Sequence, residues 1–134
     1  MATLRDETLD IRTSADIVKV RRAVRTWSAE QGFSLVDQTK LVTGASELAR
    51  NTVDHGGGGK VRIELLNDGN RKGLRMTFED RGPGIPDLDR ALTDGYSTGT
   101  GLGLGLGGTR RLMSEFRIQS EVGKGTRVEV ARWC

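Results

Sequence analysis

The spacing of the apolar residues changes along this chain from a helical period to a strand period. Up to residue 54, apolar residues recur every three or four positions, which predicts helices at 14–32 and 34–54. Beyond residue 60, they alternate with polar residues on both sides of the turn-forming sequence 67–70, which predicts an antiparallel hairpin. Shorter elements are predicted around this frame: a first strand at 8–12, a short helix at 87–94, a helix at 106–115, and strands at 116–121 and 126–131.

Helices and strands are grouped along the chain rather than strictly alternating, and this grouping favours an α+β fold. We expect a two-layer sandwich in which helices cover one face of a mixed, mostly antiparallel sheet. The length of 134 residues suits one domain, so residues 1–134 are predicted to form a single unit. Ser14 and Ser34 are the predicted N-caps of the two long helices, and Gly32 is predicted to end the first of them.

The composition argues against several classes of function. The net charge of +3 is modest, and the arginines are scattered without interleaved aromatic residues, which argues against nucleic-acid binding. An acidic protein or a polyphosphate would suit this charge. The one cysteine, Cys134, allows no intramolecular disulfide and agrees with a reducing compartment. Because no signal-like segment or stretch of about 18 apolar residues is present, we expect a cytoplasmic protein without a membrane partner.

A polar row on the second predicted helix is the first candidate for chemistry. Glu47 and Asn51 are four residues apart, so both side chains project from one face of a helix. A carboxylate here can accept a proton or orient a hydroxyl group. An asparagine carbonyl can ligate Mg²⁺ without adding charge that repels phosphate. Taken alone, the same row is also typical of a solvated helix face.

The second candidate is the sequence Asp-Arg-Gly-Pro-Gly at 80–84, which follows an apolar strand. Asp80 has no packing role at the end of such a strand, and its carboxylate can accept a hydrogen bond from an exocyclic amine. Gly82 and Gly84 let the backbone turn sharply and approach a flat ligand closely. The alternative interpretation is a tight turn held by a purely structural aspartate.

The third candidate is a glycine-rich segment, since nine of the 19 glycines lie between Gly82 and Gly108. Gly101, Gly103 and Gly105 alternate with leucine just before a predicted helix, so successive amides and the helix N-terminus can face phosphate. No P-loop string is present, and no strand directly precedes these glycines, which excludes a P-loop and a dinucleotide-binding fold. A flexible linker is the alternative, although the regular leucines argue against it.

Zinc and serine-hydrolase chemistry are not supported by the sequence. One histidine and one cysteine cannot form a closed zinc site. His55 is interpreted as a polar residue at a helix end, because no nucleophile motif accompanies it.

In this order and spacing, the motifs together resemble those of the GHKL ATPase superfamily, which includes histidine kinases, type II topoisomerases and MutL. The resemblance implies the two-layer GHKL (Bergerat) fold, with ATP and Mg²⁺ as cofactors. The N box is matched by Glu47 and Asn51, the G1 box by 80–84, the G2 box by 101–105, and the late Gly-Thr pair by Gly125 and Thr126.

Within the superfamily, nearly the whole chain from about Ile11 resembles the RsbT-type serine/threonine kinases, which are related to the anti-sigma kinases RsbW and SpoIIAB. Two departures are the glycine-rich helix exit at 55–59 and a Gly-Gly pair at 107–108 where Pro-Gly is expected. The extra glycine is expected to loosen the lid over the nucleotide. The similar strings include Ser-Glu-Leu-Ala-Arg-Asn at 46–51, Glu-Asp-Arg-Gly-Pro-Gly-Ile-Pro at 79–86 and Asp-Gly-Tyr-Ser-Thr at 94–98.

The resemblance implies a role for each matched residue. Glu47 is implied as the catalytic base or as the group that orients the attacking hydroxyl. Asn51 is implied as the Mg²⁺ ligand, and Asp80 as the partner of the adenine amino group. In the same way, Gly82 and Gly84 shape the adenine pocket, Gly101, Gly103 and Gly105 face the phosphates, and Thr126 helps to hold adenine.

The resemblance also implies the reaction and the partners. The γ-phosphoryl group of ATP is transferred to a serine or threonine of a STAS-domain protein in a partner-switching stress response, and a PP2C-type phosphatase is then activated. An anti-sigma kinase of the RsbW or SpoIIAB type, which sequesters a sigma factor, is the alternative. A binding module with a decayed ATP site is a second rival, against which the intact Glu47, Asn51 and Asp80 argue.

Overall fold

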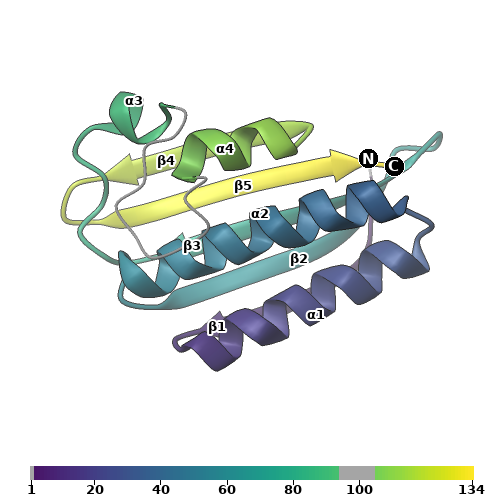
Figure 1. Cartoon of the computed structure of the whole chain (residues 1–134), viewed down its shortest axis with the longest axis horizontal. Coiled ribbons are helices and arrows are strands. Elements are labelled where there is room, and N and C mark those ends of the chain that lie inside the picture. Colours follow the sequence, from purple (N-terminus) through teal and green to yellow (C-terminus); the bar gives the residue numbers. More distant parts are fainter. Residues whose placement is uncertain (1, 94–104) are drawn as a thin grey trace.

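The computed structural model describes residues 2–93 and 105–134. Helices cover one face of a sheet in two layers, which confirms the predicted α+β sandwich (Figure 1). Within the described ranges the helices are α1 (Ser14–Glu30), α2 (Leu35–Asp54), α3 (Leu88–Ala91) and α4 (Gly105–Leu112). The strands are β1 (Ala2–Ile11), β2 (Gly59–Asn67), β3 (Lys72–Asp80), β4 (Glu115–Glu121) and β5 (Gly125–Trp133).

The described strands form a five-stranded sheet in the order β1-β2-β3-β5-β4. Each neighbouring pair is antiparallel, so the expected parallel component of a mixed sheet is absent from this part of the chain. The last strand, β5, inserts between β3 and β4. This insertion places Thr126 opposite Asp80, at the end of β3.

Local hydrogen bonds explain where the two long helices begin and end. Thr13, not the predicted Ser14, is the N-cap of α1, because the Asp16 carboxylate accepts hydrogen bonds from the N–H groups of Arg12 at 2.9 Å and Thr13 at 3.2 Å. Gly32 ends this helix with φ +82°, as predicted. Ser34 is confirmed as the cap of α2, and its Oγ accepts from the Asp37 N–H at 3.1 Å.

Several helices and strands begin or end at other residues than predicted, because strand pairing sets their limits. The first strand begins at Ala2 rather than at residue 8, since its polar first half pairs with β2 up to Asn67. The helix predicted at 106–115 ends at Leu112, because Glu115 already pairs with Ala131 of β5. The short helix predicted at 87–94 is α3, and residue 94 lies outside the described residues.

The core lies between the helices and the sheet. The predicted apolar stripe of α1 is buried there, which confirms its helical spacing. None of the helices in the described ranges is long and apolar enough to cross a membrane. The buried side chains include Ile17, Val20, Val24, Trp27, Leu41, Leu48, Val61, Ile63, Leu74, Met76 and Phe78.

The face of the sheet that the helices leave open is covered by paired charges. Glu64, with 2% of its surface exposed, lies at the centre of this network. Its carboxylate accepts two hydrogen bonds from Arg75, at 2.9 and 3.0 Å, and one from Thr3 at 3.2 Å. Arg62 lies 3.6 Å away. The hydrogen bonds from Arg75 hold the pKa of Glu64 below its ordinary value of 4.5.

Replacing Glu64 with alanine is expected to lower the free energy of unfolding by about 2 kcal/mol, because the half-buried Arg75 would lose its counter-ion and both of its hydrogen bonds to the carboxylate. Since the folded pKa of Glu64 is depressed, its stabilisation is complete above the unfolded pKa and is lost as the pH falls through the folded pKa. Urea unfolding of the wild type, Glu64→Ala and Glu64→Gln between neutral and acidic pH checks both points. If the free energy of unfolding fell equally with acid pH in the wild type and in Glu64→Gln, Glu64 would not be the source of this pH dependence. Glu121→Ala, which removes a carboxylate from an exposed ion pair, is the matched control and should change stability little.

Candidate nucleotide-binding site

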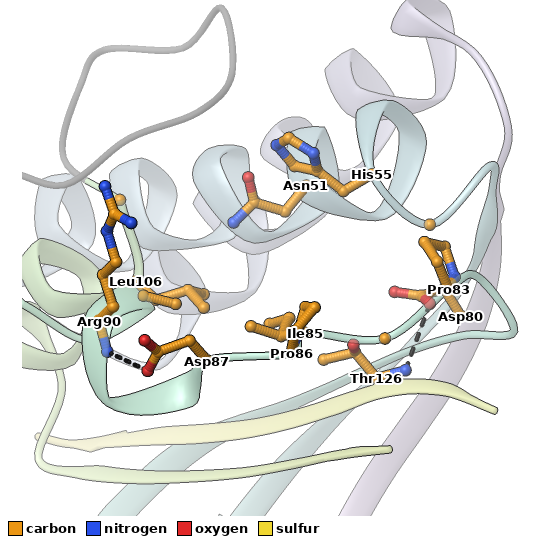
Figure 2. Close-up of a pocket in the computed structure, with 14 residues that line it drawn as sticks. Asn51, His55, Asp80, Pro83, Ile85, Pro86, Asp87, Arg90, Leu106 and Thr126 are labelled. Atoms are coloured by element: carbon orange, nitrogen blue, oxygen red, sulfur yellow. Dashed lines mark hydrogen bonds between the residues drawn. The ribbon is translucent and has the colours of Figure 1, made fainter. Parts of the chain in front are cut away.

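A cavity of about 390 Å³ opens between α2, the segment after β3, and the start of α4. Figure 2 shows α2 running along one side of it, with His55 near Asp80 and Asn51 nearer to Leu106. Its volume is in the usual range for small-molecule sites. The lining residues are Asn51, His55, Gly56, Asp80, Pro83, Gly84, Ile85, Pro86, Asp87, Arg90, Ala91, Gly105, Leu106 and Thr126.

Five of the residues predicted from the sequence meet in this cavity: Asn51, Asp80, Gly84, Gly105 and Thr126. They come from α2, the end of β3, the segment after it, the start of α4 and β5. Two others, Glu47 and Gly82, do not line the cavity. The predicted phosphate-facing residues Gly101 and Gly103 lie outside the described residues.

The two carboxylate oxygens of Asp80 have different surroundings: one holds the local turn, and the other is available to a ligand in the cavity. Oδ1 accepts hydrogen bonds from the N–H groups of Gly82 at 2.9 Å and Thr126 at 3.3 Å. Within the described part of the chain, no donor is recorded for Oδ2. A Cβ on Gly56 would lie 2.4 Å from the Asp80 Cγ, so only glycine lets the end of α2 approach this carboxylate. Asp80 therefore holds a turn, as the structural interpretation predicted, and still has an acceptor available for a ligand.

The segment after Asp80 is held between two neighbouring turns. Gly82 lies against Gly56, whose Cα would be 2.7 Å from an added Cβ, so a side chain at residue 82 would collide with the turn after α2. Gly84 has φ +78° and leaves no room for a Cβ, which would lie 2.4 Å from the Glu121 carbonyl oxygen. The Gly123 N–H donates to the Pro83 carbonyl at 2.8 Å. These contacts fix the backbone that carries Pro83, Ile85 and Pro86 into the cavity.

The polar row on α2 is not a solvated face. Glu47 is 4% exposed, although carboxylates are rarely buried to this degree without a partner or a function. Asn51 is half-buried and lines the cavity. His55 is the C-cap of α2, as its sequence position indicated, but it also lines the cavity near Asp80 (Figure 2).

The far end of the cavity is favourable for anions. Arg90 lines it, and α4 begins there at Gly105, where the N-terminus of an eight-residue helix provides positive potential. The Asp87 carboxylate caps α3 by accepting a hydrogen bond from the Arg90 N–H at 3.0 Å. Arg90 and Leu106 could not be assigned from the sequence, because a single arginine in a short helix and one leucine in a repeat carry no distinctive pattern.

Comparison with known proteins identifies the family of the chain. The sequence profile of the histidine kinase-, DNA gyrase B-, and HSP90-like ATPases matches residues 36–133. The chain belongs to this ATPase family. It is also 46% identical over 123 residues to the serine/threonine-protein kinase RsbT of Bacillus subtilis (strain 168), covering 92% of each chain. Within the ATPase family, the chain is therefore a member of the RsbT-type serine/threonine-protein kinases, which are ATP-dependent enzymes of partner-switching systems.

Solved structures agree with this membership of the ATPase family. A crystal structure of the RsbU and RsbW domains of a Mycobacterium tuberculosis protein superimposes with a TM-score of 0.66 at 27% identity, over 96% of this chain. The chain spans about a third (32%) of that longer chain. The mycobacterial sensor histidine kinase MprB superimposes with a TM-score of 0.54 at 16% identity, over 96% of this chain and 97% of its own, and supports the fold alone.

Proposed function

We propose that this kinase transfers the γ-phosphoryl group of ATP to a serine or threonine hydroxyl of a STAS-domain protein, and that it then activates a PP2C-type phosphatase. The observation that carries the proposal is the meeting of Asp80 and Asn51, from separate parts of the chain, at one cavity that ends at a helix N-terminus. One end can recognise a base, and the other can hold phosphates.

Adenine binds at the Asp80 end in this proposal. The Asp80 Oδ2 accepts a hydrogen bond from the 6-amino group, while Ile85, Pro83 and Pro86 supply apolar walls for the ring. Thr126 presents its hydroxyl beside Asp80 and contacts the ring directly or through a water. Buried polar contacts of this kind discriminate bases strongly, since a mismatched base leaves them unpaired.

The phosphates bind at the other end, where Arg90 and the first amides of α4 lie. Asn51 would hold Mg²⁺ through its amide oxygen, a hard ligand that the ion accepts. The described residues contain no group of three or more His, Cys, Asp and Glu side chains that could hold a metal. Mg²⁺ needs few protein ligands in kinases, because the phosphates and waters supply most of them. When bound, the ion neutralises charge that develops on the phosphates.

Glu47 acts on the attacking hydroxyl in this proposal. It lies one helical turn before Asn51 on α2, farther than Asn51 from the adenine end. Phosphoryl transfer requires mainly a positioned nucleophile, and a carboxylate that accepts its hydrogen bond provides the orientation. Because Glu47 is buried and does not line the cavity, the substrate hydroxyl must be brought to it when the partner and nucleotide complete the site.

The partner docks partly on α1 in this proposal. Arg21, Arg22 and Arg25 are exposed, and each lies three or four residues from another, so they repel one another along the helix. They form no ion pair with any residue of 2–93 or 105–134, whereas Arg62, Arg75 and Arg127 of the sheet are paired. Such a surface favours an acidic partner.

Reversing one of these charges, with Arg22→Glu, is expected to lower kcat/KM for the partner protein about three- to tenfold at low salt, and less at high salt. ATP affinity should not change, because α1 does not line the cavity. Steady-state phosphorylation at two salt concentrations measures this effect. An equal loss with Lys72→Glu, the same charge change on the exposed end of β3, would contradict a specific surface.

The alternative is an anti-sigma kinase of the RsbW type, which the likeness to the RsbW-containing structure favours. Incubation with labelled ATP, Mg²⁺ and a STAS-domain protein tests the main proposal, and label should appear on a serine or threonine of that protein. A pull-down from cytoplasm, where we place the protein, separates the two readings: it retains a phosphatase in the first and a sigma factor in the second. Absence of transfer to any STAS-domain protein offered would overturn the main proposal.

A further inference from the structure

The guanidinium of Arg132, near the end of β5, links the two helices α2 and α4. Its Nε and Nη2 donate to Oδ1 of Asp37, in the first turn of α2, at 3.2 and 2.7 Å. Its Nη1 donates to the carbonyl oxygen of Leu112, the last residue of α4, at 2.7 Å. Because the guanidinium is planar and rigid, it fixes the directions of both partners at once.

This junction is shielded from solvent, and each helix end suits the charge beside it. The side chains of Arg132 and Asp37 are 18% and 27% exposed. The carboxylate lies at the positive N-terminus of α2, and the guanidinium satisfies a carbonyl of the last turn of α4, which has no partner within its helix. The hydrogen bonds from Arg132 hold the pKa of Asp37 below its ordinary value of 3.8.

A second contact between the two helices lies at Gly44 of α2 (Figure 1). A Cβ on Gly44 would overlap the Cε of Met113 and would lie 3.6 Å from the Cγ2 of Thr109. The helices therefore approach closely at a residue without a side chain, so this contact sets their separation but provides no side chain that fixes their angle. The junction at Arg132 supplies a second point, and two points fix the orientation of α4 on α2.

The orientation of α4 matters because the phosphate end of the proposed site is divided between these helices. Asn51, the proposed Mg²⁺ ligand, projects from α2, whereas Gly105 and Leu106 line the cavity from the first turn of α4. Gly105 lies about 6 Å along the helix from the contact at Gly44, so a pivot of roughly 10° would move it by about 1 Å. A displacement of this size is enough to impair the positioning of a reacting group.

We infer that Arg132 is a positioning residue for the phosphate end: by tying the C-terminus of α4 to the N-terminus of α2, it holds the first turn of α4 in place relative to Asn51. This inference rests on the proposed function. The effect should be confined to the phosphates. The adenine end is formed by Asp80 and the segment after it, and neither Asp37 nor Leu112 lies there.

Calorimetric titration with ATP and with AMP, each in the presence of Mg²⁺, separates the two ends, since AMP retains the base and lacks the β- and γ-phosphates. In Arg132→Met, ATP should bind about tenfold more weakly, and AMP affinity should change less than about twofold. Asp37→Ala should lower ATP affinity similarly, and the double variant should lose little more than either single variant, because both changes remove the same link. Arg127→Met, which removes an arginine of the same strand from an exposed ion pair with Glu79, should bind both nucleotides as the wild type does.

A merely structural role for Arg132 would weaken ATP and AMP equally, and that result, or unchanged affinity for both, would overturn the inference. The Ser114 N–H still donates to the Ala131 carbonyl at 2.9 Å in these variants, so the chain after α4 stays attached to β5. If Arg132→Met fails to fold, Arg132→Lys retains the charge without the rigid fork, and an unchanged ratio of ATP to AMP affinity there also overturns it. Failure of the wild type to bind ATP would instead contradict the proposed function.

Discussion

Glu47→Ala is expected to abolish phosphoryl transfer to the partner protein while ATP still binds. A group that accepts or orients the proton of a nucleophile contributes about 10²- to 10⁴-fold to the rate. Glu47 does not line the nucleotide cavity, so its removal should change ATP affinity by less than about threefold. Single-turnover transfer with labelled ATP and a separate nucleotide titration measure the two effects.

Two further variants separate chemistry from folding. Because Glu47 is buried, alanine leaves a cavity that destabilises the helix packing, whereas Glu47→Gln keeps the volume and removes only the charge. Asp54→Asn removes a carboxylate from an exposed position on the same helix and should transfer phosphate normally. If Glu47→Gln retained a wild-type rate of transfer, Glu47 would lose its proposed role.

Asp80→Asn is expected to weaken ATP binding about 100-fold. The asparagine oxygen can still accept hydrogen bonds from Gly82 and Thr126, so the turn should persist. Its amide nitrogen would then replace Oδ2 and point a donor at the donating 6-amino group of adenine. Loss of a charged acceptor and exposure of an unpaired donor together account for an effect of this size.

The matched control for Asp80→Asn is Glu79→Gln, which removes one charge from the adjacent residue of β3. Glu79 projects from the other face of the sheet, where it pairs with Arg127 at 3.2 Å. Nucleotide titration of both variants should show a large change for Asp80 and less than about a twofold change for Glu79. Unchanged ATP affinity in Asp80→Asn would remove that residue from the adenine site.

The types of secondary structure could be predicted from the sequence because each depends on neighbouring residues. The apolar spacing of α1 and α2, the Ser34 cap and the hairpin of β2 and β3 are examples. The start of β1 could not be predicted, because its first residues are polar and are held only by pairing with β2. The same reason explains why α4 ends three residues early, where pairing with β5 competes with the helix.

Some features of the candidate site could likewise be predicted from the sequence, and others could not. Asp80, Asn51 and the glycines were predicted because their chemistry is visible in short motifs, and the position of Glu47 on α2 followed from a four-residue spacing. The burial of Glu47 could not be predicted, since it depends on packing against distant parts of the chain. The contacts of Ser120 with Ile85 and Thr126 could not be predicted either, because they depend on strand pairing and on the path of the segment after β3.

The sequence by itself determined the helices and hairpins, the order of the motifs and the kinds of groups that could meet a nucleotide, since all of these are local properties. Only the tertiary structure decided which of these groups meet. Insertion of β5 between β3 and β4 brings Thr126 beside Asp80, 46 residues earlier in the chain. Strand order is fixed by the burial of the whole sheet beneath its helices, and no short segment carries that information.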